Sequence, residues 1–229
     1  MKRPYIICHM MMSLDGRIDC AMTEKIPGSK EYYETLASLE ASTLLNGRVT
    51  AAMEMAGPGC FKAEHAVPVG KECVARHAAA AGYQVVLDSK GTLLWSDDDG
   101  AETPLLVILS EQAPQEYLAY LDGRHISWIV CGKDEVDLRR AVELLYSEFG
   151  VRRMTVAGGG TINGAFLDAG LLDEMSILIG PGIDGRKGMV SVFDGIPMDR
   201  GPVTLHLQDV QRYDDGAVWL RYTFVKAGL

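Results

Sequence analysis

The sequence predicts an α/β fold of three layers, in which helices cover both faces of a mostly parallel central sheet and an antiparallel C-terminal hairpin forms one edge. Short apolar segments alternate with segments of helical spacing along most of the 229 residues. The C-terminal part instead alternates apolar and polar residues on both sides of a D-G turn. Hydrophobic residues make up 48% of the chain and charged residues 23%, so we expect a globular protein with a single domain over residues 1–229.

The first predicted element is a buried strand over residues 5–12, an apolar run followed by the turn signal Asp15-Gly16. This segment has the composition of a strand rather than that of a signal peptide. A helix is predicted over residues 30–39, because Ser29 is a candidate N-cap. A second strand is predicted over residues 43–45, a short apolar run before an N-G pair.

Two helices are predicted between this strand and the next one. The first begins near Arg48 and ends before Gly57-Pro58-Gly59, because glycine and proline break helices. The second spans residues 72–81, where alanine is frequent, and Gly82 is expected to close its C-terminus.

Three strands are predicted in the middle of the chain from short apolar runs. They span residues 84–87, 105–109 and 126–130. The first of them ends at a polar turn, residues 88–91, and a helix over residues 114–121 separates the other two. These elements are typical of a parallel sheet with helical crossovers.

The last third of the chain continues the alternation and then changes character. A helix over residues 138–149 has apolar residues at helical spacing, and a strand over 154–157 precedes a helix over 162–169. A strand follows over residues 174–179. Two segments of alternating polarity then surround Asp214-Asp215-Gly216, which predicts a closing β-hairpin.

Charge and cysteine content exclude several classes of protein. A formal net charge of −9 disfavours nucleic-acid binding, which requires a basic surface. The five cysteines form no C-x-x-C pair and the five histidines form no H-E-x-x-H motif, so we predict no metal site and reduced thiols in the cytoplasm. No apolar run approaches the roughly 18 residues of a membrane helix, so we expect no membrane partner.

A glycine-rich loop between a predicted strand and a predicted helix is the first candidate site. Gly158-Gly159-Gly160 allows the backbone to approach a ligand closely, and the helix that follows presents unpaired N–H groups to an anion. Thr161 adds a hydroxyl group, and Ile162 begins the predicted helix. The alternative is a glycine-rich turn that binds nothing, since the motif is neither G-x-G-x-x-G nor a P-loop.

A second candidate is Ser13-Leu14-Asp15-Gly16, which directly follows the first strand. Ligands of open α/β sheets collect at the carboxyl ends of strands, so Asp15 is a candidate for orienting a substrate or handling a proton. The alternative is that Asp15 only caps a common D-G turn.

Two further strand ends carry polar side chains. Thr50 follows Gly47-Arg48-Val49 and has a hydroxyl group that could hold a phosphate; the alternative is a simple helix cap. Ser89 and Lys90 follow the strand over residues 84–87 and would suit the 2′-phosphate that distinguishes NADPH from NADH. A solvated turn is the alternative for this pair.

Taken together, these motifs resemble those of the riboflavin-pathway pyrimidine reductases, which have the dihydrofolate-reductase fold. The resemblance extends over nearly the whole chain, with the motifs in the same order. The matching segments are Ser13-Leu14-Asp15-Gly16, Gly47 to Thr50, Val85 to Ser89, Gly158 to Thr161, Gly170 to Glu174 and Gly180 to Gly185. No zinc-deaminase signature is present, so the resemblance is to the reductase half of the bifunctional deaminase–reductase.

The resemblance implies a small-molecule reductase that uses NADPH and forms a homodimer. By this analogy, Gly159 to Ala165 cradle the pyrophosphate, and Thr50 and Glu54 also meet the cofactor. Ser89 would lie near the 2′-phosphate, and Met11 would line the nicotinamide. The hydride would pass to C1′ of a ribosylamino group, and Ser13 and Asp15 would face the substrate.

Three positions bear on the substrate. The family often has glutamate at the position of Ala157 and arginine at that of Glu40, while Lys62 is a candidate for binding a substrate phosphate. The cofactor positions are therefore kept and the substrate positions altered. Two alternatives stay open: a reductase of the same fold that acts on dihydrofolate or a small carbonyl or imine, and a non-catalytic NADPH-binding protein.

Overall fold

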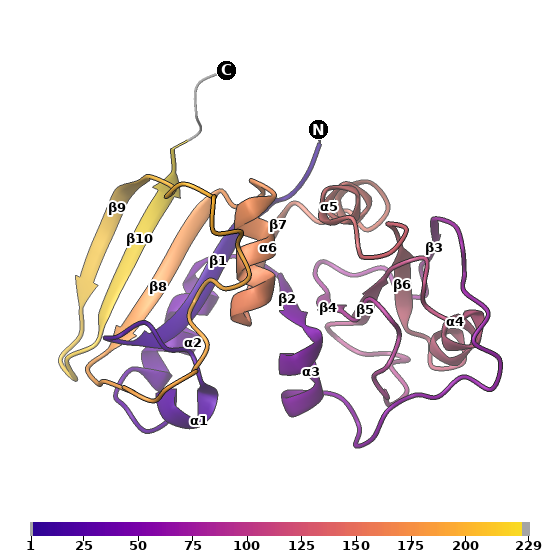
Figure 1. The fold of residues 1–229 in the computed structure, drawn as a ribbon, viewed down its shortest axis with the longest axis horizontal. Helices are drawn as coiled ribbons and strands as arrows, with labels where there is room; N and C mark the ends of the chain where they lie inside the picture. The colour runs from indigo at the N-terminus through magenta and orange to yellow at the C-terminus, as the bar shows by residue number, and fades with distance from the viewer. Residues whose placement is uncertain (1, 226–229) are drawn as a thin grey trace. The chain divides into compact units, whose positions relative to one another are not determined.

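The computed structural model describes residues 2–225, which form two compact units (Figure 1). Unit 1 contains residues 2–4 and 42–154, and unit 2 contains residues 5–41 and 155–225. The prediction of a single domain over 1–229 stays a prediction beside this division. Within residues 2–225, no helix combines the length and the apolar character that crossing a membrane requires.

The sheet of unit 1 is mostly parallel. Its strands lie in the order β3-β6-β5-β4-β2, and the four from β6 to β2 run parallel to one another. The short strand β3 pairs antiparallel with β6. The strands are β2 (Thr43–Gly47), β3 (Cys73–Ala75), β4 (Gln84–Leu87), β5 (Leu105–Leu109) and β6 (Ser127–Val130).

The inner strands of unit 1 are buried on both faces, as their continuous apolar runs predict. One face packs Val86, Val107 and Val130 against Tyr117 and Leu121 of helix α4 (Gln115–Asp122). Helix α3 (Arg48–Glu54) contributes only Ala51 to this cluster. Helix α5 (Leu138–Ser147) buries a separate apolar stripe, as its spacing predicts.

The predicted helix over residues 72–81 is wrong. Its first part forms strand β3 and the rest is not helical, because the side chains of Ser127 and of nearby Tyr83 take up its backbone groups. The Ser127 hydroxyl accepts hydrogen bonds from the N–H groups of His77 and Ala78 at 3.1 and 3.4 Å. The Tyr83 hydroxyl donates to the carbonyl of Ala78 at 3.2 Å. Such tertiary bonds outweigh the modest helix propensity of an alanine-rich segment.

Gly82 does not close a helix either. A Cβ atom at this position would overlap the backbone of Ser42, so close contact between two chain segments requires glycine there. Gly82 is therefore glycine because it packs against the Ser42 backbone, and not because it ends a helix as predicted.

Unit 2 contains the second group of strands. They lie in the order β7-β1-β8-β10-β9, with β1 and β8 parallel and the other pairs around β10 antiparallel (Figure 1). The last two strands form the predicted hairpin. The strands are β1 (Tyr5–Ser13), β7 (Arg153–Val156, which begins in unit 1), β8 (Glu174–Gly180), β9 (Leu205–Arg212) and β10 (Val218–Phe224).

Three helices belong to unit 2: α1 (Cys20–Thr23), α2 (Ser29–Ser38) and α6 (Gly160–Asp168). Helix α2 covers one face of the strands, where Ile7, Leu178 and Trp219 form the apolar cluster. Ser29, the candidate N-cap, is instead the first helical residue. Gly28 takes the cap position in a left-handed conformation with φ of 115°.

The predicted fold class is confirmed by this arrangement of elements. Helix α6 begins two residues earlier than predicted, and most other boundaries agree within one or two residues. Helix α1 and strand β3 were not predicted, because a four-residue helix and a three-residue strand are too short for a periodic pattern.

A buried histidine connects four elements of unit 2. The side chain of His9, on β1, is 0% exposed and its ring stacks on Tyr32 of α2. Its Nδ1 atom lies 2.9 Å from the Ser176 hydroxyl, which accepts a hydrogen bond from Trp219 at 2.8 Å. Its Nε2 atom lies 3.2 Å from the carbonyl of Tyr32. One neutral tautomer satisfies the whole chain, because Ser176 can donate to Nδ1 while the Nε2–H group donates to Tyr32.

Burial makes His9 a source of acid sensitivity, because it lowers the pKa of His9 from 6.5 to about 4. The unfolded chain therefore binds this proton more readily than the folded chain does. The free energy of unfolding has its full value above pH 6.5 and falls as the pH decreases towards 4. The full difference is about 3 kcal/mol.

We predict that His9→Gln flattens the dependence of the urea midpoint on pH between 6.5 and 4. His206→Gln, at an exposed position, is the control. An unchanged slope in the His9 variant would contradict this role.

Candidate functional site

The glycine loop lies in unit 2, where β7 ends and α6 begins. Gly159 is the N-cap of α6 and has an extended backbone with φ of −74° and ψ of −173°. No side chain caps the helix, and its first turn contains no acidic residue. Thr161 is exposed and Ile162 is half-buried. The first N–H groups of the helix therefore have no side-chain acceptor, as the glycine-loop hypothesis requires.

The members of this loop are glycine for different reasons. Gly158 has φ of +120°, a backbone conformation that other residues rarely adopt. A Cβ atom on Gly160 would overlap the carbonyl oxygen of Ser191, and one on Gly164 would overlap that of Asp194. A Cβ atom on Gly159 meets no atom within 4 Å. Of the four glycines Gly158, Gly159, Gly160 and Gly164, Gly159 is thus the one at which a side chain would meet open space.

A distant segment, residues 191–195, holds this loop in place. The backbone N–H of Asp194 donates to the carbonyl of Gly160 at 3.0 Å, and the Asn163 amide donates to the carbonyl of Val192 at 2.8 Å. The Asp194 carboxylate in turn accepts from the N–H of Ser191 at 3.1 Å. These residues were not among the predicted site residues. The D-G pair at Asp194 signals a turn, but nothing in the sequence connects that turn with α6.

The second candidate motif forms a closed turn after β1, also in unit 2. The buried Ser13 hydroxyl donates to Asp15 Oδ1 at 2.6 Å. The N–H groups of Asp184 and Gly185 donate to Oδ1 and Oδ2 of Asp15 at 3.0 and 2.9 Å. Asp15 therefore connects the turn to the segment after β8, a role that the D-G pair alone did not predict.

These hydrogen bonds decide what Asp15 can do chemically. The bond from Ser13 and the two backbone bonds hold the pKa of the Asp15 carboxyl well below its usual value. The side chain is therefore ionised at neutral pH and accepts hydrogen bonds rather than donating a proton. Since Oδ2 accepts only one of these bonds, the exposed carboxylate can accept another from a substrate hydroxyl.

Met11 and Met10 point to opposite faces of β1. The Met11 side chain is buried in the apolar cluster beside Gly28. The Met10 side chain instead lies next to Gly158, 3.4 Å from the position of a Cβ atom there. A contact between Met11 and a ligand would therefore involve its backbone, and Met10 is the methionine whose side chain reaches the glycine loop.

Three of the predicted site residues of unit 1 lie on or after α3. Thr50 is half-buried in the first turn of the helix, and Glu54 is its exposed last residue. Lys62 is exposed in the segment that follows. The other two, Ser89 and Lys90, lie on the turn after β4, where Ser89 is half-buried and Lys90 exposed.

The two positions that depart from the family pattern are also visible. Ala157 is half-buried directly after β7, and Glu40 is exposed with a positive φ of 51°. Among residues 2–225, no three histidine, cysteine, aspartate or glutamate side chains gather as metal ligands would.

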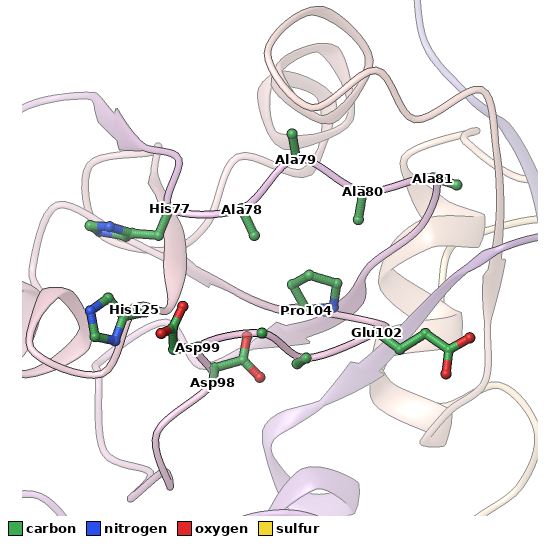
Figure 2. Close-up of a pocket in the computed structure, with 12 residues that line it drawn as sticks. His77, Ala78, Ala79, Ala80, Ala81, Asp98, Asp99, Glu102, Pro104 and His125 are labelled. Carbon is green, nitrogen blue, oxygen red and sulfur yellow. The ribbon is translucent and has the colours of Figure 1, made fainter.

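Unit 1 also has a surface depression of about 360 Å³ that contains none of the predicted site residues (Figure 2). Figure 2 shows the extended segment Ala78–Ala81 on one side and Asp98, Asp99 and Glu102 on the other. Its two histidines, His77 and His125, lie 2.8 and 3.3 Å from carboxylate oxygens of Asp122 and Asp97. Both histidines thus already have a carboxylate partner, and no ligand is needed to explain their positions.

A family model described as the RibD C-terminal domain matches residues 4–219, and the chain belongs to this family.

Two relatives resemble nearly the whole chain. A protein of Methanothermobacter thermautotrophicus, named 2,5-diamino-6-ribosylamino-4(3H)-pyrimidinone 5′-phosphate reductase, is 29% identical over 225 residues, which are 93% of this chain and 94% of that protein. A protein of the same name from Archaeoglobus fulgidus is 27% identical over 84% of this chain and 87% of its own length. The prediction of an oxidoreductase is thus confirmed at the level of the family.

Two solved structures share the fold. A pyrimidine reductase-like protein of Corynebacterium diphtheriae superimposes with a TM-score of 0.72 at 18% identity, covering 97% of this chain and 92% of that chain. The riboflavin biosynthesis reductase Rib7 of Saccharomyces cerevisiae gives 0.63 at 19% identity, covering 97% and 90%. The predicted reductase fold is confirmed.

Two single substitutions test why the glycine loop has its sequence. We predict that Gly159→Ala leaves stability unchanged within about 0.5 kcal/mol, because its Cβ atom meets open space. Gly160→Ala should lower stability by roughly 1–3 kcal/mol, because its Cβ atom overlaps Ser191. Thermal unfolding of both variants without ligand measures the difference. Equal losses would show that Gly159 is also glycine for packing.

Proposed function

We propose that the chain is an NADPH-dependent reductase of the riboflavin-biosynthesis type. Its substrate would be a phosphorylated ribosylamino pyrimidine such as 5-amino-6-(5-phosphoribosylamino)uracil. The observation that carries the proposal is the open space at Gly159, at an uncapped helix N-terminus, in a chain that matches reductases of such compounds over nearly its full length.

The glycine loop fits the pyrophosphate of a dinucleotide. Its backbone N–H groups provide donors, and no residue of the first turn of α6 is itself acidic. Gly158, Gly159, Gly160, Thr161 and Ile162 are the proposed contacts. In unit 1, Thr50, Glu54, Ser89 and Lys90 are the proposed contacts, and Ser89 and Lys90 favour NADPH over NADH.

When bound, the cofactor supplies a hydride, which the proposed reaction adds to C1′ of an open-chain ribosylamino group to give a ribitylamino product. The residues of the chain align the substrate and exclude water. Asp15 is proposed to accept a hydrogen bond from a substrate hydroxyl, with Ser13 holding its carboxylate in place. Because Asp15 is ionised, the proton that completes the reduction comes from another group.

The proposal includes a homodimer in the cytoplasm. Strand β9 is almost wholly exposed and, within residues 2–225, pairs with β10 alone. It presents Leu207 and Val210 with 48% and 53% of their surface exposed. An open strand edge with apolar side chains favours pairing with a second chain. The five cysteines are all free thiols, which is typical of the cytoplasm.

We predict that the purified protein oxidises NADPH when given the ribosylamino pyrimidine phosphate, with at least about ten-fold lower activity on NADH. Absorbance at the nicotinamide band and mass analysis of the product measure this. Oxidation of NADPH with dihydrofolate or a small carbonyl but not with the pyrimidine would instead agree with the altered position Ala157. Tight NADPH binding without turnover on any of these compounds would indicate a non-catalytic binding protein.

Asp15→Asn should lower kcat more than it weakens NADPH binding, because Asp15 is proposed to face the substrate and not the cofactor. The variant retains one acceptor oxygen but loses the charge that receives the bonds from Asp184 and Gly185. Steady-state kinetics and calorimetry with NADPH separate the two effects. A large loss of cofactor affinity with unchanged kcat would remove Asp15 from the substrate site.

A further inference from the structure

A buried carboxylate closes the loop that carries Ser89 and Lys90. Asp88 directly follows β4, and its side chain is 0% exposed. Its Oδ2 atom accepts from the N–H groups of Thr92 and Leu93 at 2.6 and 2.8 Å, and its Oδ1 atom accepts from the Thr92 hydroxyl at 3.0 Å. The loop is thus tied to its own first residue.

The backbone on both sides of the pair is fixed by further contacts. The carbonyl of Ser89 accepts from both the N–H and the hydroxyl of Ser110, at 2.9 and 2.8 Å. Gly91 has φ of +67°, and a Cβ atom there would overlap the ring of Tyr117. The Tyr117 hydroxyl donates to the carbonyl of Leu93 at 2.8 Å. The loop is therefore rigid before any ligand binds.

The side chains that this loop presents are not used by the fold. Within the part of the chain that the structure describes, the Ser89 hydroxyl has no hydrogen-bond partner and the Lys90 ammonium forms no ion pair. The chain has 31 acidic and only 22 basic residues, so an ammonium group left unpaired beside a hydroxyl is notable. A hydroxyl and an ammonium group on a rigid loop suit the oxygens of a phosphate monoester.

We propose that Asp88 is the positioning residue for Ser89 and Lys90, and that the ligand group they recognise is the 2′-phosphate of the cofactor. This inference rests on the proposed function, since NADPH is the cofactor named there. Asp88 does not contact the phosphate, because both of its oxygens face the loop backbone and Thr92. It acts by fixing the backbone of Ser89 and Lys90, from which the two side chains extend.

Geometry rather than charge carries this role, which makes two variants informative. In Asp88→Asn, the amide oxygen can accept from the N–H groups of Thr92 and Leu93, while the amide nitrogen donates to the Thr92 hydroxyl. Asp88→Ala removes every acceptor and leaves two backbone N–H groups without their partner, so the loop opens. The asparagine variant should therefore behave as the wild type, and the alanine variant should not.

The test uses 2′,5′-ADP and 5′-AMP as probes, titrated calorimetrically into the full chain. We expect the wild type to prefer 2′,5′-ADP by at least about ten-fold, Asp88→Asn to keep this preference, and Asp88→Ala to lose most of it. Asp98→Ala is the matched control, because Asp98 accepts from the N–H of Leu105 at 2.7 Å in another loop of unit 1. Its preference should be unchanged. The ratio of the two affinities is the readout, since general destabilisation lowers both affinities together.

Several outcomes would overturn the inference. A folded Asp88→Ala variant that keeps the preference would contradict it, as would an Asp88→Asn variant that loses it. If Asp88→Ala does not fold, Ser110→Ala replaces it, because it removes one of the two bonds to the Ser89 carbonyl. That variant should show a smaller preference for 2′,5′-ADP, and an unchanged preference would contradict the inference.

A wild type that prefers 2′,5′-ADP but reduces no substrate would contradict the proposed function and leave this inference standing. Equal binding of the two probes would contradict the inference and the proposed preference for NADPH over NADH, while turnover of the pyrimidine with either cofactor would leave the proposed reductase activity standing.

Discussion

The packing of residues 191–195 against the first turns of α6 is the contact on which the candidate site of unit 2 depends. It fixes Gly160 and Gly164 as glycine, because any side chain there would overlap this segment. It leaves Gly159 facing open space at an uncapped helix N-terminus. The arrangement of the loop on which the proposed anion site depends therefore follows from a contact with a part of the chain some thirty residues away.

Hydrogen bonds to carboxylates fix the other two candidate segments in the same manner. Asp15 ties the turn after β1 to the segment after β8, and Asp88 ties the loop after β4 to its own start. In both cases the carboxylate accepts hydrogen bonds from backbone N–H groups and so holds the loop in place. The electrostatic consequence differs, because Asp15 is exposed and ionised and can also accept a bond from a substrate.

The sequence predicted the features that depend on local pattern. The apolar runs of β1, β4 and β5 were sufficient, because their short length and the turn residues that follow them favour a strand over a helix. The segment over residues 72–81 was not predictable, since Ser127, fifty residues from His77, and Tyr83, just beyond the segment, hold it in a non-helical conformation. The glycine loop was recognised as a candidate, but its division into packing glycines and one open position required the contact with Ser191.

Calorimetric titration of NADPH into the wild type and into Gly159→Asp tests the central claim most directly. The variant should fold at least as well as the wild type, because aspartate is a favourable N-cap and its Cβ atom meets no atom within 4 Å. Its carboxylate would occupy the space of the pyrophosphate and repel its negative charge. The affinity for NADPH should therefore fall by at least about a hundred-fold. Undiminished binding by the folded variant would contradict the assignment of the cofactor to this loop.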